Sequence, residues 1–335
     1  MNSFNEPVKA VIIFAPTASG KTELAIKLAK KFNTEIISLD SCQIYKDLTI
    51  CSCAPTVEQL LEVRHHLVQI YPPNTRIDAA SISDLAFTVC SQLNAVNRIP
   101  IVVGGSFMYI KFFIHGYIKD FKLDAELNGN YEALKMLDPE YALTVNPNDK
   151  VRINRALKFI LQNARRFSEA IKEHRFQALR VMPLIISPVW ERSALYLRIE
   201  KRCQNMLESG LLNEVKTVFN LYGEEAWGLK KTIGYKYFIE VIKGNLTTGR
   251  AFELLVRDTK RFARQQFYYL KNEPQKRGYT VLPGKDDYDF PIVEISQGKS
   301  KIFAFKLTFN DLVSFVRNFD FRRPTVLCIE SSNVL

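Results

Sequence analysis

The chain has 335 residues, of which 47% are hydrophobic and 24% are charged, as in an ordinary globular protein with a substantial core. Lys and Arg number 46 against 35 Asp and Glu, and the formal net charge of +11 favours a polyanionic partner such as nucleic acid or an acidic membrane surface, although a basic proteome would give the same balance. No two of the six cysteines have the two-residue spacing of a zinc knuckle or redox motif, which argues against those classes and predicts buried, reduced thiols.

The first predicted element is a short β-branched and aromatic strand, Val8–Phe14, which is too short to span a membrane and precedes no cleavage-type segment. We therefore expect a cytoplasmic protein without membrane attachment. Apolar residues then recur at helical spacing over Lys21–Lys31, and two further strands are predicted at Glu35–Leu39 and Ile99–Val103. Strands that alternate with helices predict an α/β fold, a doubly wound parallel sheet of the P-loop type, with functional loops at the strand carboxyl ends.

Polar turns separate short helical segments after residue 115, which predicts a helical insertion before a returning strand at Val181–Ser187. Later helices are expected over Ser193–Glu208, Leu212–Tyr222, Arg250–Lys271 and, after a break at Pro274, Asp311–Asn318. We therefore divide the chain into the first part of a P-loop core (1–115), a helical insertion (116–180), a part that completes the core and carries basic helices (181–274), and a C-terminal extension (275–335).

The segment between the first strand and the first helix has the pattern of a phosphate-binding loop. Backbone N–H groups of such a loop point toward a phosphate chain, its lysine adds a positive charge, and the next hydroxyl binds Mg²⁺. Ala15 stands where the motif has its first glycine, so the loop would be strained if φ had to be positive there. The expected phosphate-binding residues are Ala15, Pro16, Thr17, Ala18, Ser19, Gly20, Lys21 and Thr22, with Thr22 as the metal ligand.

Asp40 follows the second strand, and the residues alone leave its role open between a Mg²⁺ ligand and the cap of a following helix. The run Asp40-Ser-Cys-Gln-Ile-Tyr45 and the later run Gly104-Gly-Ser-Phe-Met-Tyr109, taken with the phosphate loop, resemble the tRNA dimethylallyltransferase family. That family carries Gly-Pro-Thr-Ala-Ser-Gly-Lys-Thr, Asp-Ser-x-Gln-x-Tyr and Gly-Gly-Thr-x-x-Tyr in this order. The resemblance continues to about Lys271 and so covers most of the chain.

The resemblance implies a particular reaction. The exocyclic N6 amine of the adenosine 3′-adjacent to the anticodon in tRNA attacks the first carbon of dimethylallyl pyrophosphate, and pyrophosphate leaves. Asp40 would take the proton of the amine, and Ser106, where the family has threonine, would contact the donor. Arg202 and Lys231 would join the phosphate loop in binding pyrophosphate, with Mg²⁺ as the cofactor.

The same resemblance implies tRNA as the partner of a protein that we expect to be monomeric. A base must leave its stack to reach a pocket, and Ser41, Cys42 and Gln43 beside Asp40 would hold it. Two basic clusters would contact tRNA phosphates, although a charged helix face is more often only solvated. These clusters are Arg152 and Arg155 in the insertion, and Lys260, Arg261 and Arg264 in the last long helix before Pro274.

Several positions depart from the family pattern. The usual Gly-Thr-Ala-Lys-Pro segment reads Cys51-Ser-Cys-Ala-Pro55, which loses a lysine, and a usual arginine is Lys231, which keeps the charge but loses the bidentate fork. These changes suggest a divergent and slow enzyme. Two alternatives stay open: a P-loop kinase or ATPase that uses Asp40 as a Mg²⁺ ligand, and a decayed family member that only binds tRNA.

Overall fold

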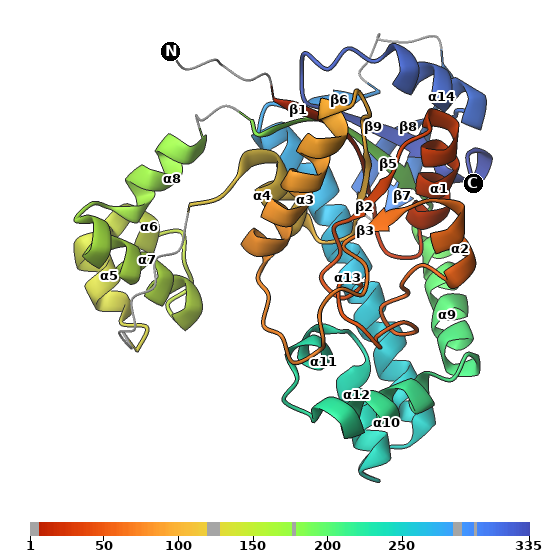
Figure 1. Cartoon of the computed structure of the whole chain (residues 1–335). Coiled ribbons are helices and arrows are strands. Elements are labelled where there is room, and N and C mark those ends of the chain that lie inside the picture. Colours follow the sequence, from red (N-terminus) through yellow and green to blue (C-terminus); the bar gives the residue numbers. More distant parts are fainter. Residues whose placement is uncertain (1–6, 119–127, 176–178, 284–289, 298–299) are drawn as a thin grey trace. The chain divides into compact units, whose positions relative to one another are not determined.

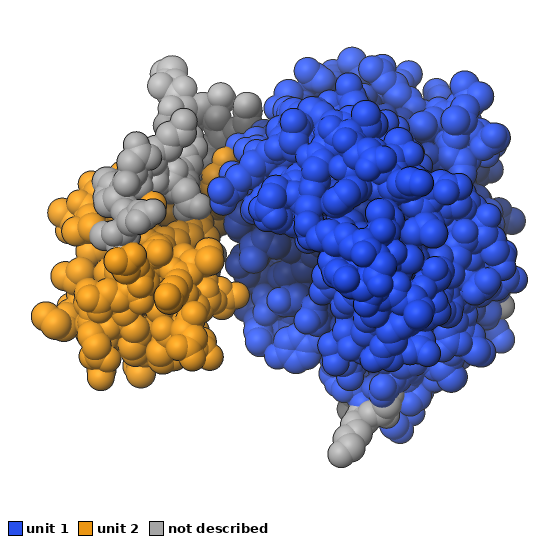
Figure 2. All heavy atoms as spheres, turned by 90° about the horizontal axis from the view of Figure 1, so that it is seen from below, with its two compact units in different colours: residues 1–114, 180–335 blue, residues 115–179 orange. Residues whose placement is uncertain are grey.

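A computed structural model of the protein describes residues 7–118, 128–175, 179–283, 290–297 and 300–335. It contains two compact units, residues 1–114 with 180–335 and residues 115–179, which Figure 2 shows in different colours. The chain leaves the larger unit after Ile114 and returns at Arg180, whose N–H donates a hydrogen bond to the Ile114 carbonyl at 2.9 Å. The smaller unit is therefore inserted between two neighbouring points of the larger one.

The larger unit is built on one nine-stranded sheet (Figure 1). Eight strands run in the order β3-β2-β4-β1-β5-β9-β8-β7, and β6 pairs with β9; only β7 and β8 pair antiparallel among the described pairs. The strands are β1 Val8–Phe14, β2 Ile36–Ser38, β3 His65–His66, β4 Ile101–Gly104, β5 Val181–Val189, β6 Thr280–Leu282, β7 Ile292–Gln297, β8 Ser300–Phe305 and β9 Thr325–Glu330.

Helices cover both faces of this sheet. On one face, alternate residues of the central strands, such as Val11 and Ile13 of β1, form an apolar cluster with α1 (Lys21–Phe32) and α14 (Phe309–Asn318). Helix α3 (Ala79–Ala95) packs on β1 and β2 with buried residues outside that cluster. The predicted α/β class with a doubly wound, largely parallel sheet is therefore confirmed.

The remaining helices of the larger unit are arranged along one long helix. Helix α13 (Thr248–Lys276) buries residues at helical spacing, from Ala251 and Leu255 to Leu270, and continues through the buried Pro274. We expected the helix to end at this proline, but it ends two residues later. Pro274 removes only one backbone hydrogen bond, close to the helix end. Figure 1 shows α10, α11 and α12 gathered at the N-terminal end of α13. The other helices are α2 Val57–Glu62, α4 Phe107–His115, α9 Arg192–Glu208, α10 Leu211–Tyr222, α11 Trp227–Lys231 and α12 Tyr235–Ile242.

The smaller unit is helical throughout its described part. Its core is apolar and includes Leu134, Ile153 and Phe159. The buried Asp138 caps a helix by accepting from the Tyr141 N–H, and it also accepts hydrogen bonds from Ser168. No described helix of either unit is long and apolar enough to cross a membrane. The helices are α5 Tyr131–Leu137, α6 Pro139–Ala142, α7 Lys150–Asn163 and α8 Phe167–Arg175, and the chain closes with a short 3₁₀ turn, η1 Ser331–Asn333.

Candidate active site

The phosphate loop joins β1 to α1 at the carboxyl edge of the sheet. Its backbone enters the left-handed region at Ala18 (φ 63°) and at Gly20 (φ 89°) but not at Ala15. The strain expected at Ala15 therefore falls on Ala18, since an alanine in this region is less favourable than a glycine. Ala15 and Ser19 are buried, which places the loop tightly between the strand and the helix that it joins.

A buried glutamine far along the chain holds this loop against the end of β4. The Thr17 N–H donates to the Gln266 Oε1 at 2.8 Å, and the Gln266 Nε2 donates to the Gly105 carbonyl at 2.7 Å. A Cβ atom on Gly105 would come within 2.6 Å of the same Nε2, so a larger residue here would displace the Gln266 amide. Gln266 thereby fixes the spacing between the phosphate loop and the strand end that carries Ser106.

Lys21 opens α1 and points back over the loop. Its Nζ donates to the Pro16 carbonyl at 2.8 Å. The pKa of Lys21 is lowered to about 7. Burial is the largest cause and the nearby Arg202 the second, while Asp40 and Cys53 act in the opposite direction. The ammonium form is therefore poorly compensated here, and an anion beside it would stabilise its charge.

Asp40 lies in a turn at the end of β2. Its Oδ1 accepts from the N–H groups of Cys42 at 2.8 Å and Gln43 at 3.3 Å. No helix begins after it, since residues 41–47 form turns and one isolated bridge. The helix-cap alternative is therefore wrong. The half-buried carboxylate is oriented by its own turn and lines a pocket.

That pocket has a volume of about 300 Å³ and brings together several of the predicted active-site residues. Its walls come from the phosphate loop, the ends of β2 and β4, residues 51–52, and α9, α11 and α13. Thr17 lines it from the phosphate loop, and Phe262 lines it from α13. The other predicted residues that line it are Asp40, Ser41, Cys42, Ser106, Arg202 and Lys231.

The cations of the pocket are bonded to neutral groups. The Arg202 Nε donates to the Cys53 Sγ at 2.9 Å, and the Lys231 Nζ lies 3.5 Å from the Tyr109 hydroxyl. Burial also lowers the pKa of Lys231, which Cys42 partly opposes. Among the described residues, no carboxylate lies within 4.0 Å of the charged nitrogens of Lys21, Arg202 or Lys231. The pocket therefore has positive charge left for a bound anion.

Ser106, predicted to contact the donor, and Gln43, predicted to hold the acceptor base, differ in how free their side chains are. The Ser106 hydroxyl makes only a long contact, donating to the Ser41 Oγ at 3.5 Å. The Gln43 amide is engaged at both ends, because its Nε2 donates to the Cys53 carbonyl at 2.8 Å and its Oε1 accepts from the Ser38 hydroxyl at 2.9 Å. Gln43 thus orders the pocket wall rather than pointing into it.

One carboxylate that we did not single out for function holds the other wall in place. The Glu214 Oε2 accepts from the N–H and the hydroxyl of Thr49, both at 2.8 Å, and from the Ile50 N–H at 2.6 Å. Its Oε1 accepts from the Cys51 N–H at 3.1 Å and the Tyr235 hydroxyl at 2.7 Å. Helix α10 therefore positions the segment that carries Cys51 and Cys53. A lone glutamate on a helix gives no sequence signal for contacts this distant.

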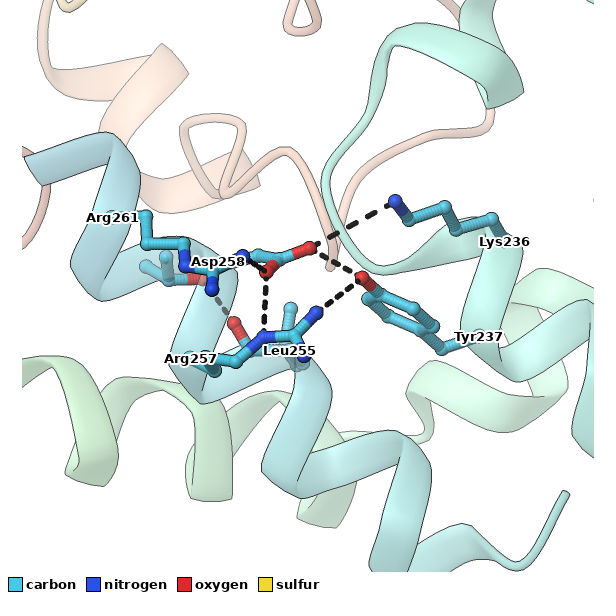
Figure 3. A network of polar contacts seen from close by, with 7 residues as sticks. Lys236, Tyr237, Leu255, Arg257, Asp258 and Arg261 are labelled. Carbon is cyan, nitrogen blue, oxygen red and sulfur yellow. Dashed lines mark hydrogen bonds and ion pairs between the residues drawn. The ribbon is translucent and has the colours of Figure 1, made fainter. Parts of the chain in front are cut away.

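The basic residues of α13 lie outside the pocket and are mostly paired. Figure 3 shows Asp258 contacted by Arg257 at 3.0 Å, by Arg261 at 3.6 Å and by Lys236 at 3.8 Å. Tyr237 also donates a hydrogen bond to Asp258. Burial raises the pKa of the Asp258 carboxyl, but its hydrogen bonds and cationic neighbours together lower the pKa by more. The net shift is therefore downward.

The other predicted tRNA-binding cations are divided between the two units. Lys260 pairs with Glu200 of α9, whereas Arg264 is exposed and has no ion pair among the described residues. In the smaller unit, Arg152 pairs with Asp149 at 3.3 Å, and Arg155 donates to the Ile118 carbonyl at 3.2 Å.

Comparisons with known proteins show which family the chain belongs to. The model of the IPP transferase family matches residues 43–273. The chain is 34% identical to tRNA dimethylallyltransferase 1 of Citrifermentans bemidjiense, over 82% of this chain and 92% of the relative, and 34% identical to the tRNA dimethylallyltransferase of Staphylococcus epidermidis, over 78% and 84%. A eukaryotic dimethylallyltransferase acting on tRNA, 23% identical, shares the fold with a TM-score of 0.73 over 81% of this chain and 71% of that one.

Two bacterial structures are similar as well. The tRNA isopentenylpyrophosphate transferase of Bacillus halodurans is 29% identical, with a TM-score of 0.61 over 79% of this chain and 87% of that one. The corresponding enzyme of Staphylococcus epidermidis is 33% identical, with a TM-score of 0.59 over 80% and 91%. Sequence, fold and site geometry thus lead to one conclusion: this chain is a member of the IPP transferase family.

Proposed function

We propose that this chain is a tRNA dimethylallyltransferase, which moves a dimethylallyl group from dimethylallyl pyrophosphate to N6 of the adenosine 3′-adjacent to the anticodon. The observation that carries the proposal is the composition of the pocket. It combines cations that lack carboxylate partners with the single carboxylate of Asp40 at its wall. The cations suit a pyrophosphate, and the carboxylate suits a group that must lose a proton.

In the proposed reaction, the lone pair of N6 forms a bond to the first carbon of the donor, and the bond from that carbon to the pyrophosphate oxygen breaks. Asp40 accepts the proton that N6 releases. The charge that develops on the leaving pyrophosphate is stabilised by Arg202 and Lys231 of the pocket, and by the N–H groups and Lys21 of the adjoining phosphate loop. Ser106, whose hydroxyl makes only one long contact, is free to donate to the donor oxygen.

The residues present fit a Mg²⁺ ion shared with the substrate. Thr22 is half-buried at the start of α1, and its hydroxyl has no hydrogen-bond partner among the described residues. No group of three His, Cys, Asp or Glu side chains in the described chain could hold a metal ion alone. Thr22 would help to hold Mg²⁺ together with the substrate, and the ion would neutralise charge on the leaving group.

The acceptor is a tRNA whose target base is turned out into the pocket, where Ser41 and Cys42 line the wall beside Asp40. Phosphates of the same tRNA would contact the exposed Arg264 and the basic residues around it. This surface includes Lys260 and Arg261. Arg152 and Arg155 would contact tRNA phosphates separately, from the smaller unit. We propose that the protein acts as a monomer.

The proposal is tested with labelled dimethylallyl pyrophosphate, Mg²⁺ and an anticodon stem-loop, beside a stem-loop that lacks the target adenosine. Label is expected only in the first RNA. Asp40→Asn is expected to lower turnover about 10²- to 10⁴-fold while pyrophosphate still binds. Asp47→Asn is the matched control, because it makes the same change at an exposed aspartate whose partner is the Tyr222 hydroxyl. Undiminished turnover in Asp40→Asn would contradict the assigned role.

A further inference from the structure

Two side chains from outside the phosphate loop bind its backbone carbonyls. The Trp190 Nε1 donates to the Ser19 carbonyl at 3.1 Å, and the Arg198 Nε donates to the Ala18 carbonyl at 2.9 Å. The Arg198 guanidinium also lies 4.3 Å from the centre of the Trp190 ring. One stacked pair therefore holds two successive peptide groups of the loop from the same side.

Peptide geometry gives this contact a consequence for phosphate binding. In a trans peptide the C=O of one residue and the N–H of the next point in opposite directions. Fixing the carbonyls of Ala18 and Ser19 therefore turns the N–H groups of Ser19 and Gly20 away from the stacked pair. Nothing in the described part of the chain accepts a hydrogen bond from either N–H. Both donors are thus oriented for an anion on the far side of the loop.

Trp190 is in turn held by residues that lie beyond the family match. The Gln297 Nε2 donates to the Trp190 carbonyl, and the Ser296 N–H donates to the Glu191 Oε1 at 2.8 Å. Strand β9 runs parallel to β5 up to the pair Val189↔Glu330, directly before Trp190. The family match ends at residue 273, so these contacts come from a part of the chain outside it.

The same C-terminal part touches the loop directly. A Cβ atom on Gly20 would lie 2.2 Å from the Leu335 Cδ1, so this leucine packs against the glycine itself. The Lys27 Nζ of α1 also donates to the Leu335 carbonyl at 2.6 Å. The loop, which has Ala18 in an unfavourable backbone region, is therefore supported from two sides by residues 292–335.

We propose that Trp190 is a positioning residue for the donor, and that the C-terminal part of the chain holds it in place for that task. The inference rests on the proposed function, since it assumes that the loop binds pyrophosphate. Trp190 touches neither reacting group. It acts through the Ser19 carbonyl, and Gln297 acts through Trp190.

The test is binding of inorganic pyrophosphate with Mg²⁺, measured by titration calorimetry on the full chain. Trp190→Phe keeps a ring for Arg198 to stack on but removes the N–H donor, and is expected to weaken pyrophosphate about threefold to tenfold. The KM for the donor should rise by a similar factor, while the KM for the stem-loop and the turnover at saturating donor stay unchanged. Pyrophosphate should also alter the fluorescence of Trp190, and this signal should disappear in the variant.

A second pair of variants distinguishes loss of the Trp190 contact from a general loss of folding. Gln297→Met removes the donor to Trp190 and should weaken pyrophosphate about twofold to fivefold. Gln204→Met makes the same change on α9, where the amide binds only Glu208 one turn away, and should leave binding unchanged. A folded Trp190→Phe protein that binds pyrophosphate like the wild type would overturn the inference, as would equal binding by the two glutamine variants. A wild-type chain that binds no pyrophosphate would instead overturn the proposed function.

Discussion

The cations of the pocket and the cations of α13 have different partners. Lys21, Arg202 and Lys231 are bonded to a backbone carbonyl, a thiol and a phenol, all neutral. Arg257 and Arg261 share the carboxylate of Asp258, as Figure 3 shows, and Lys260 is paired with Glu200 in the same manner. Most of the basic residues of α13 are therefore paired with carboxylates, whereas Lys21, Arg202 and Lys231 have no ion pair among the described residues.

This difference separates two ways of binding phosphate. A partly buried cation next to neutral groups is costly in the empty protein and gains strongly when an anion arrives, because little water screens the pair. An exposed cation already paired with a carboxylate gains little from a further phosphate and is screened by salt. The pocket is thus suited to a compact, highly charged group, whereas α13 is suited to weak and distributed contacts along an RNA backbone.

Removing a pocket cation should have the largest effect. Lys21→Met is expected to lower prenyl transfer about 10²- to 10³-fold, because the leaving pyrophosphate loses a charge that no neighbour can replace. Steady-state turnover with a stem-loop acceptor measures this. Lys30→Met is the control on the same helix: that lysine is exposed and paired with Glu62 at 2.8 Å, so a change beyond about twofold is not expected. Equal losses in the two variants would contradict the distinction between the two classes of cation.

Giving a pocket cation a carboxylate partner should have an intermediate effect. In Cys53→Asp the new carboxylate replaces the thiol that Arg202 contacts, so pyrophosphate binding should weaken about tenfold. Cys53→Ser keeps a neutral acceptor and should bind pyrophosphate within about threefold of the wild type. Titration calorimetry with inorganic pyrophosphate compares the two. Should the serine variant lose as much as the aspartate variant, charge would not be the cause.

Releasing surface cations should have the smallest effect, and in the opposite direction. Asp258→Asn keeps much of the hydrogen bonding but removes the charge shared by Arg257, Arg261 and Lys236. The affinity for tRNA is expected to rise about twofold to fivefold at low salt, with a steeper dependence on salt concentration. Filter binding over a salt series measures both, and the KM for the donor serves as the control. An unchanged salt dependence would mean that these residues do not face the RNA.

Local sequence signals were sufficient for many of the elements, whereas Ser106, Arg202 and Lys231 were expected from the resemblance to the family. The strand before the phosphate loop was predicted with its observed bounds, and the long helices lie within a few residues of theirs. Asp40 and Ser106 could be placed together because both follow parallel strands, whose carboxyl ends share one edge of the sheet. Their assigned roles in catalysis stay predictions.

Contacts between distant residues could not be predicted. Glu214 binds backbone groups more than 160 positions earlier, and Gln266 joins two loops that no spacing rule connects to it. The spacing of Arg257, Lys260 and Arg261 correctly indicates one helix face, but their carboxylate partners come partly from another helix. Such pairings depend on tertiary packing, which a single sequence pattern does not encode.

The position of β9 in the sheet has a consequence for how the protein is made. This strand lies between β5 and β8, so the sheet cannot be completed until residues 325–330 have left the ribosome. Until then β5, buried along most of its length in the final fold, presents an open apolar edge that invites wrong pairing. Part of the support for the phosphate loop comes from Gln297 and Leu335, far downstream of the loop in the chain. A nascent chain therefore carries the phosphate loop well before the residues that complete the support of the loop.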